Sequence, residues 1–328
     1  MFAEAIDRIL RDQCTPSVVR SIEAGGSSAA LWQAVGDAGF FELMASESDG
    51  GAGLSLSELF PVISSFGRYA VPLPLSQTIV SRVLLRGHAV PDGMVTLAPQ
   101  ARRCPDGGIS CSHTPYGALA DVVIMRDGDG MLVLPTDRAR REASGIWSSQ
   151  IATLSWADDR DAVRISKGGE LVTAFGAALY AGMLTGAMAR VFEMTLQYCN
   201  DRVQFGKSLG KFQAVQHQLS VMAEHVAAST IAAQAAFHCG GMSPGMLSAA
   251  VAKSRTSEAA VLVASTAHAL HGALGITEEY DLQLFTRRLH EWRMVHGSEA
   301  HWNAFVGRRV LGGACSLSGF VQSLLRTS

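Results

Sequence analysis

The sequence is poor in charged and aromatic residues. Lysine and arginine number 27 and aspartate and glutamate 29 among 328 residues, so 17% are charged, the net charge is −2, and aromatic residues make up 7%. With no excess of either sign, the chain offers no general electrostatic attraction for nucleic acid or anionic lipid, and we expect neither as a partner. A hydrophobic content of 48% excludes disorder over most of the chain. So few polar residues also predict that some apolar surface is buried between subunits.

Clustered cysteine is also missing. No cysteine forms a CxxC pair or a Cys/His cluster, so neither a disulfide framework nor a zinc site is predicted. The six are Cys14, Cys104, Cys111, Cys199, Cys239 and Cys315. Ten histidines are present, several in the C-terminal segments, and in the absence of carboxylate neighbours we interpret them as packing residues and predict no metal. The segment Met1–Leu10 has no cationic stretch followed by an apolar run, so we expect no secretory signal and a cytoplasmic location.

Other signatures are absent as well. No GxGxxG, GxxxxGK[ST] or GxSxG motif occurs in a suitable setting, which argues against an intrinsic dinucleotide site, a P-loop and a nucleophile elbow. Two long stretches, Leu171–Ala189 and Ala259–Thr277, lack Asp, Glu, Lys and Arg and approach the length of a membrane span. Because both are rich in Ala and Gly, we interpret them as buried bundle helices and expect no membrane insertion, with membrane spans as the alternative.

The chain divides into three regions that differ in the spacing of their apolar residues. Residues 1–90 show helical spacing at Ala3–Leu10, Ala30–Leu43 and Leu54–Gly67, where Ser55 and Glu58 form a possible capping box, and loops at 46–53 and 70–74. Residues 91–169 contain short apolar runs at Met94–Leu97, Asp121–Met125 and Met131–Leu134. Gly- and Asp-rich turns such as Asp106–Gly108 bound these runs, and the pattern is typical of antiparallel strands. Residues 170–328 read as four long helices at Thr173–Asp201, Phe212–Cys239, Pro244–Gly272 and Leu282–Leu311. We predict an α+β, mainly helical chain: an N-terminal helical domain, a small β domain and a C-terminal four-helix bundle.

The string DRVQFGKSLGKFQAVQ at residues 201–216 concentrates positive charge where two helices join. Gly206 and Gly210 break the helix, while Arg202, Lys207 and Lys211 gather beside the start of the next one, a setting suited to an anion. From spacing alone, a basic helix–loop–helix turn on a solvated face is the favoured interpretation, with an anion site as the alternative.

This string resembles the R-x-x-F-G … F-Q signature of the acyl-CoA dehydrogenase family. The segment LHGALGITEEY at 270–280 is similar to that family's h-G-G-x-G-[YF]-x-x-[ED]-[YF] segment, and Arg287 falls at its R-D arginine. The run His296-Gly297-Ser298 falls at its E-G-[TS] motif. The helix–β–helix order also fits the family's architecture.

The resemblance implies flavin chemistry on an acyl-CoA thioester. In that family a carboxylate removes the α-proton while the β-hydrogen leaves as hydride to FAD, and the carboxylate is commonly the Glu of E-G-[TS]. Here that position is His296, which would be neutral as a base and cationic after the transfer. The stretch Ala174–Gly182, where some relatives place the base, contains no acid, and Glu170 and Glu299 lie out of register. We therefore leave the catalytic residue unassigned, with His296 at the base position and Glu299 a weak candidate.

The family's flavin-ring motifs in the β domain are not visible either. Neither T-E-x-x-x-G-S-D nor W-[IV]-T/S occurs in 91–169, and Trp147 and Trp156 stand in unmatched contexts. Family dimers bind each FAD across the subunit boundary, and the R-x-x-F-G … Q segment serves the neighbour's flavin. By that analogy Arg202, Gln204, Phe205 and Gln213, together with Gly272 and Ser298 in the matched segments, are the expected cofactor-binding residues.

The combination predicts the short, base-lacking subunit of a heteromeric FAD-dependent acyl-CoA dehydrogenase. Its expected partners are a larger subunit in an α2β2 heterotetramer with which it shares FAD, an acyl-CoA that the resemblance suggests is a steroid side-chain thioester, and an electron-transfer flavoprotein or similar acceptor. Two alternatives stay open: a homo-oligomeric dehydrogenase that uses His296 or Glu299, and a flavin-free scaffold subunit that keeps only the fold.

Overall fold

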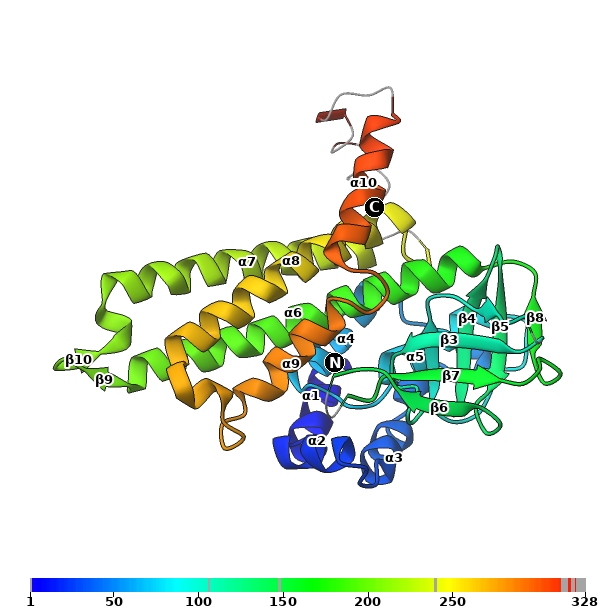
Figure 1. Cartoon of the computed structure of the whole chain (residues 1–328), viewed down its shortest axis with the longest axis horizontal. Coiled ribbons are helices and arrows are strands. Elements are labelled where there is room, and N and C mark those ends of the chain that lie inside the picture. Colours follow the sequence, from blue (N-terminus) through cyan, green and yellow to red (C-terminus); the bar gives the residue numbers. More distant parts are fainter. Residues whose placement is uncertain are drawn as a thin grey trace.

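A computed structural model describes residues 2–105, 107–146, 149–238 and 241–313, together with residues 318, 319 and 322. Figure 1 shows a β region at one end, long helices extending away from it, N-terminal helices packed below, and one helix, α10, projecting from the body. Asp106, Trp147, Cys239 and Cys315 lie outside the described residues. The helix–β–helix order and the mainly helical α+β class are as predicted.

The N-terminal region is helical and follows the apolar spacing with two corrections. Ser55 and Glu58 form the reciprocal capping box that was predicted. The expected helix Ala30–Leu43 is wrong at its end, because Gly39 adopts φ 77° and the chain continues as a separate short 3-10 turn. A further helix follows the proline pair and was not predicted. The elements are α1 (Phe2–Gln13), α2 (Pro16–Glu23), α3 (Ala29–Asp37), η1 (Phe40–Glu42), η2 (Glu47–Asp49), α4 (Leu56–Arg68) and α5 (Leu75–Leu84).

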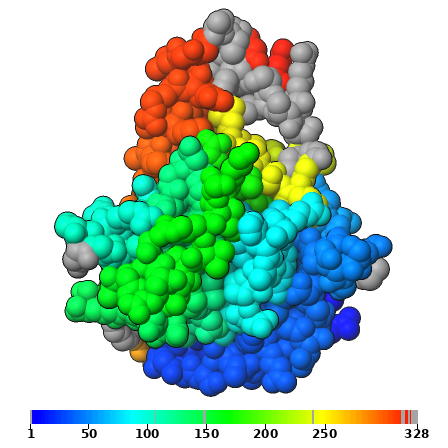
Figure 2. All heavy atoms as spheres, turned by 90° about the vertical axis from the view of Figure 1, so that its right-hand side faces the viewer, coloured from blue at the N-terminus to red at the C-terminus, as the bar shows by residue number. Residues whose placement is uncertain are grey.

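The β region is two four-stranded sheets that face each other across an apolar core. The strands are β1 (Val95–Ala98), β2 (Arg102–Arg103), β3 (Ile109–Thr114), β4 (Val122–Asp127), β5 (Gly130–Pro135), β6 (Arg140–Ala143), β7 (Ala152–Trp156) and β8 (Val163–Ile165). Their orders are β1-β4-β5-β8 and β2-β3-β7-β6. The prediction of antiparallel strands is wrong for β1 and β4, which pair in parallel, because the chain passes through β2 and β3 of the other sheet between them. In Figure 2 this region faces the viewer beside the blue N-terminal helices, and α10 stands above it.

The C-terminal region is a bundle around one buried helix. Its elements are α6 (Gly169–Asp201), β9 (Val203–Gln204), β10 (Lys207–Ser208), η3 (Leu209–Lys211), α7 (Gln213–Phe237), α8 (Met246–His271), η4 (Gly272–Ile276), α9 (Leu282–Trp292) and α10 (Glu299–Leu311). The expected fourth helix Leu282–Leu311 is wrong, because His296 and Gly297 adopt φ 54° and 97° and divide it into α9 and α10. Helix α6 packs so closely on α4 that a Cβ at Gly186 would lie 1.8 Å from the carbonyl oxygen of Ser64.

Two helical segments, Gly169–Asp201 and Met246–Ile276, are long and apolar enough to span a membrane by length and composition. Most of the apolar window of the first is buried inside the chain, but less than half of the second is. Burial of α6 by its own chain is what the bundle interpretation expects of a core helix. One core cluster joins Ile6 of α1, Leu97 of β1 and Trp302 of α10, so the division at residues 90 and 169 stays a prediction about regions of sequence.

Candidate functional site

The R-x-x-F-G string forms a tight hairpin at the far end of the bundle from the β region (Figure 1). Lys207 pairs with Gln204, so Phe205 and Gly206 are the two turn residues, and both have positive φ, 52° and 79°. That is the geometry of a type I′ turn, whose twist matches the flanking strands. The Phe205 side chain is 91% exposed. A large apolar ring is thus held in solvent at a strained backbone position.

Positive charge surrounds this hairpin, as the sequence predicted. Arg202 is exposed, and Gln204, with its amide oriented so that the oxygen faces the guanidinium, accepts from Arg202 Nη2 at 2.8 Å. Lys207 Nζ lies 4.3 Å from the centre of the Phe212 ring. Helix α7 begins at the exposed Gln213, and the side chain of its N-cap residue, Phe212, makes no capping hydrogen bond. Its free N–H groups therefore add to the positive character of the exposed hairpin.

Gly272 lies at the same end of the bundle, and Ser298 does not. The hydroxyl of Tyr198, near the end of α6, donates to His271 O at 3.4 Å, and the two rings stack at 4.4 Å. Gly272 ends α8 at φ 61° with open space where a Cβ would stand. Ser298 instead caps α10 beside Lys253, whose Nζ donates to Gly297 O at 3.0 Å. Nineteen residues of helix separate Lys253 from Gly272, or about 28 Å at 1.5 Å per residue. The structure therefore does not gather the six expected cofactor-binding residues into one site.

The imidazole at the family's base position is turned into the protein interior. His296 is 6% exposed, and its Nε2 donates to Leu97 O at 3.2 Å, which leaves Nδ1 as the unprotonated nitrogen. Nδ1 is buried without a hydrogen-bond partner among the described residues. A Cβ at Gly176 of α6 would lie only 2.3 Å from Nδ1. The lone pair that a base would use therefore faces helix backbone.

Burial also keeps this imidazole neutral. Desolvation is the largest cause that lowers the pKa of His296, to about 4; the charge of Lys253 lowers it further, and the hydrogen bond to Leu97 O raises it. At neutral pH the ring carries no charge, and it takes up a proton only well below pH 6. The tilted contact with Tyr180, 5.6 Å between ring centroids, completes its packing.

A fully buried lysine fixes the turn that carries His296. Lys253 Nζ donates to Trp292 O at 3.0 Å, Arg293 O at 2.8 Å and Gly297 O at 3.0 Å, and it also bonds the Ser257 hydroxyl. Desolvation lowers the pKa of Lys253 to about 7. The ammonium satisfies the last carbonyls of α9 and the left-handed turn together. Sequence reasoning missed this residue, because a lysine in an Ala-rich helix carries no motif.

Neither of the other candidate acids forms a hydrogen bond with His296 over the described residues, and Glu299 Oε2 is buried without a partner of its own. Glu299 pairs with Arg293, and Glu170 is exposed in the first turn of α6. Between α5 and α6 the side chains of Gln77 and Tyr180 are buried, and Gln77 Nε2 donates to the Tyr180 hydroxyl at 3.2 Å. Neither Gln77 nor Tyr180 was singled out from the sequence. The structure thus gives no support to proton abstraction by Glu299.

The remaining aromatic candidates belong to the core. Trp156 is buried between the sheets and donates from Nε1 to Pro135 O at 2.8 Å. Trp292 is buried, and Tyr280 packs on His271 with ring centroids 5.2 Å apart. Over the described residues, no group of three or more His, Cys, Asp or Glu side chains is arranged to hold a metal ion.

Comparison with known proteins identifies relatives along nearly the whole chain. The descriptions "Acyl-CoA dehydrogenase, N-terminal domain" and "Acyl-CoA dehydrogenase, C-terminal domain" match residues 1–87 and 172–311. The acyl-CoA dehydrogenase IpdE2 of Mycolicibacterium smegmatis is 30% identical over 305 residues, which cover 88% of this chain and 91% of the relative.

Two solved structures share the fold. The ChsE4-ChsE5 complex from Mycobacterium tuberculosis aligns with a TM-score of 0.82 at 19% identity, covering 95% of this chain and 97% of the other. The Tcur3481-Tcur3483 steroid ACAD variant aligns with a TM-score of 0.83 at 22% identity, covering 96% and 98%.

Proposed function

The chain belongs to the acyl-CoA dehydrogenase family, and from this premise we propose that it is the subunit of a heteromeric dehydrogenase that serves a partner chain's FAD and supplies no base of its own. The observation that carries the proposal is the orientation of His296. Its free Nδ1 faces the backbone at Gly176, so the position that would abstract a proton is occupied by core packing. In this proposal the partner chain oxidises the thioester.

The hairpin end of the bundle fits a flavin contributed by a neighbour. An exposed guanidinium at Arg202, an uncapped helix start at Gln213 and a glycine at 272 with open space around it are the groups that a diphosphate requires. When bound, the flavin supplies the hydride acceptor for α,β-dehydrogenation of an acyl-CoA. In this arrangement Arg202 holds the diphosphate, Gln204 orients the Arg202 guanidinium, and Phe205 covers apolar surface at the subunit boundary.

The interior around His296 does not fit a flavin and thioester of this chain's own. Leu97 O and Gly176 contact the imidazole directly, and Tyr180 and Gln77 fill the neighbouring volume. In this proposal no cofactor binds beside His296, and the role of Ser298 is to cap α10.

Likeness to solved complexes of two chains, one of them named a steroid ACAD, supports a larger partner subunit and a bulky, steroid-type acyl-CoA as substrate. The α2β2 stoichiometry, an electron-transfer flavoprotein or similar acceptor, and the cytoplasmic location belong to the same proposal.

The test is to co-express the chain with the larger acyl-CoA dehydrogenase chains of its own genome and to measure flavin by absorbance per mole of each chain in any complex that co-purifies. We expect one FAD per two chains, lost by at least half in Arg202→Ala and retained in Arg8→Ala, an exposed arginine on α1. His296→Gln, whose amide can still donate to Leu97 O, should leave turnover within a factor of two.

The alternatives give different results in the same experiment. Turnover by the isolated yellow chain that is lost in His296→Gln would establish the homo-oligomeric enzyme. A complex without flavin, or flavin content that is unchanged by Arg202→Ala, would establish a scaffold and overturn the shared site.

A further inference from the structure

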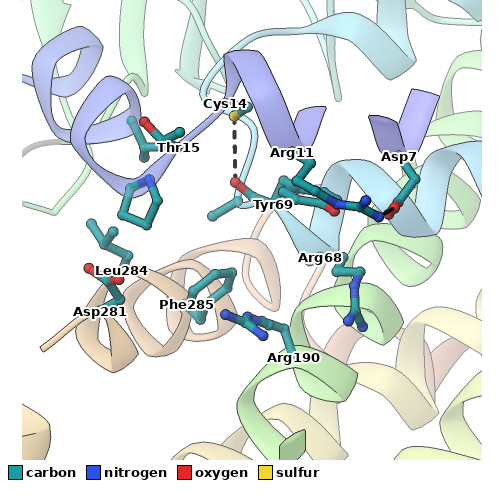
Figure 3. A pocket seen from close by; sticks show the side chains of 13 residues that line it. Asp7, Arg11, Cys14, Thr15, Arg68, Tyr69, Arg190, Asp281, Leu284 and Phe285 are labelled. Carbon is teal, nitrogen blue, oxygen red and sulfur yellow. Dashed lines mark hydrogen bonds and ion pairs between the residues drawn. The ribbon is translucent and has the colours of Figure 1, made fainter. Parts of the chain in front are cut away.

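A cleft of about 350 Å³ lies between the N-terminal helices and the bundle, away from both regions described above (Figure 3). It is lined by α1, the start of α2, the end of α4, and parts of α6 and α9. Its volume is in the range of pockets that hold small organic molecules. On α6, Arg190 lies 14 residues beyond Gly176 and 12 before Arg202, or about 21 and 18 Å along the helix.

One wall of this cleft is apolar. Val19 of α2 and Leu284 and Phe285 of α9 line it, and all three are otherwise buried in the core. Cys14 also lines it, with its thiol donating to Tyr69 O at 3.6 Å. An apolar ligand part placed on this wall would lose its contact with water without disturbing a hydrogen bond.

The opposite wall carries three arginines from three helices, Arg11, Arg68 and Arg190. Two of them are held by carboxylates at hydrogen-bond distance. Arg11 bonds Asp7 at 2.6 Å, and Arg68 forms a bidentate pair with Glu193 at 2.7 and 2.8 Å. The second acid that lines the cleft, Asp281, pairs with Arg20 at 2.7 Å.

Arg190 differs from the other two arginines. It approaches Glu193 only to 3.8 Å, because that carboxylate already accepts both donors of Arg68. Figure 3 shows its guanidinium beside the Phe285 ring, at the boundary between the charged and apolar walls. A planar guanidinium with donors still available next to an apolar wall is suited to a carboxylate that carries an apolar group.

We propose that this cleft binds a small organic monoanion, a carboxylate with an apolar body. The carboxylate accepts from Arg190, and the body lies on Val19, Leu284 and Phe285. A single charge is expected because the other arginines are neutralised within the chain. The site is independent of the flavin contacts at the hairpin, so its failure would leave the proposed function untouched.

The test uses 4-phenylbutanoate and its uncharged amide as probes, with the full chain in its purified assembly and isothermal titration calorimetry as the readout. We expect saturable binding of the carboxylate and at least tenfold weaker binding of the amide. Arg190→Gln should weaken carboxylate binding at least tenfold, whereas Arg8→Gln, in the neighbouring groove along α1, should change it less than twofold.

Glu193→Gln should change the affinity for 4-phenylbutanoate in the opposite direction. It removes the carboxylate that competes for Arg68 and Arg190, so binding of 4-phenylbutanoate should tighten several-fold. Arg190 and Glu193 are partly exposed on α6, so both variants should fold, and the helical circular dichroism of each checks this. Absence of saturable binding, equal binding of acid and amide, or an unchanged affinity in Arg190→Gln would each overturn the proposal.

Discussion

The close contact between Gly176 and His296 predicts that Gly176→Ala changes stability in opposite directions when the imidazole of His296 is present and when it is removed. A Cβ added at Gly176 would meet Nδ1, Cγ and Cε1 of His296 at 2.3, 2.5 and 2.7 Å. The imidazole cannot move freely, because Leu97 O accepts from Nε2 and the ring packs on Tyr180. Overpacking of this kind costs about 1–3 kcal/mol.

Helix propensity acts in the opposite direction. Alanine in a helix interior is favoured over glycine by about 0.5–1 kcal/mol. Gly176→Ala should therefore destabilise the parent chain by about 1–2 kcal/mol. In a His296→Ala background, where the ring is absent, the same change should stabilise by about 0.5–1 kcal/mol.

The assay is thermal unfolding of the parent, the two single variants and the double variant in the same assembly. At about 2 °C per kcal/mol for a chain of this length, Tm should fall by about 2–4 °C in the parent and rise by about 1–2 °C in the His296→Ala background. Gly307→Ala, in the interior of α10 with open space around it, is the control and should raise Tm slightly in both. A Tm change of the same sign in both backgrounds would refute the packed position of the imidazole.

Three further predictions follow from single residues. Phe205→Asn places a residue that tolerates positive φ in the type I′ turn, so the isolated chain should gain up to about 1 kcal/mol in stability. Flavin retention in the complex should fall, as measured by size-exclusion chromatography and flavin absorbance. Unchanged flavin retention would contradict the role of the Phe205 ring. Because the pKa of His296 is lowered to about 4 in the folded chain, the unfolded chain binds one more proton between pH 6.5 and pH 4, and stability that is present above pH 6.5 is lost as the pH falls toward 4. His296→Gln should remove up to about 3 kcal/mol of this loss, measured by denaturant titration at several pH values. Parallel plots of unfolding free energy against pH for the parent and the variant would contradict the prediction. Lys253→Met leaves the Arg293 and Gly297 carbonyls without their ammonium donor and should lower the free energy of unfolding by about 3 kcal/mol. Tm should fall by about 6 °C, whereas Lys167→Met, at an exposed position, should leave Tm unchanged.

Most of the helical architecture could be predicted from apolar spacing and capping residues. The capping box at Ser55 and Glu58 and the buried helix over 169–201 required only local signals. The division between α9 and α10 could not be predicted in this way, because a histidine at positive φ is an exception that its sequence neighbours do not indicate. The parallel pairing of β1 and β4 depends on which sheet the intervening strands join, and that is decided by tertiary packing.

The hairpin part of the candidate site could be predicted, because the same residues show both the turn and the positive charge. The Phe205-Gly206 pair suits a type I′ turn, and the surrounding cations are read directly from the string. The closure around His296 was not predictable, because it depends on a glycine 120 residues earlier and on a lysine with no motif. A missing acid shows in the sequence, whereas the direction in which its replacement points does not.

The backbone strain at Phe205 and the backbone strain at His296 are compensated in different ways. Phe205 and His296 both hold positive φ before a glycine, a conformation that costs each about 1 kcal/mol or more. For His296 the compensation is internal: Trp302 Nε1 donates to its carbonyl, Leu97 O accepts from its ring, and Lys253 holds the following turn. For Phe205 the internal contacts are few, since its ring is 91% exposed and meets Phe212 only edge-on at 6.3 Å. We therefore expect the partner chain proposed above to cover Phe205 and to offset the strain at the hairpin, at the end of the bundle far from the β region.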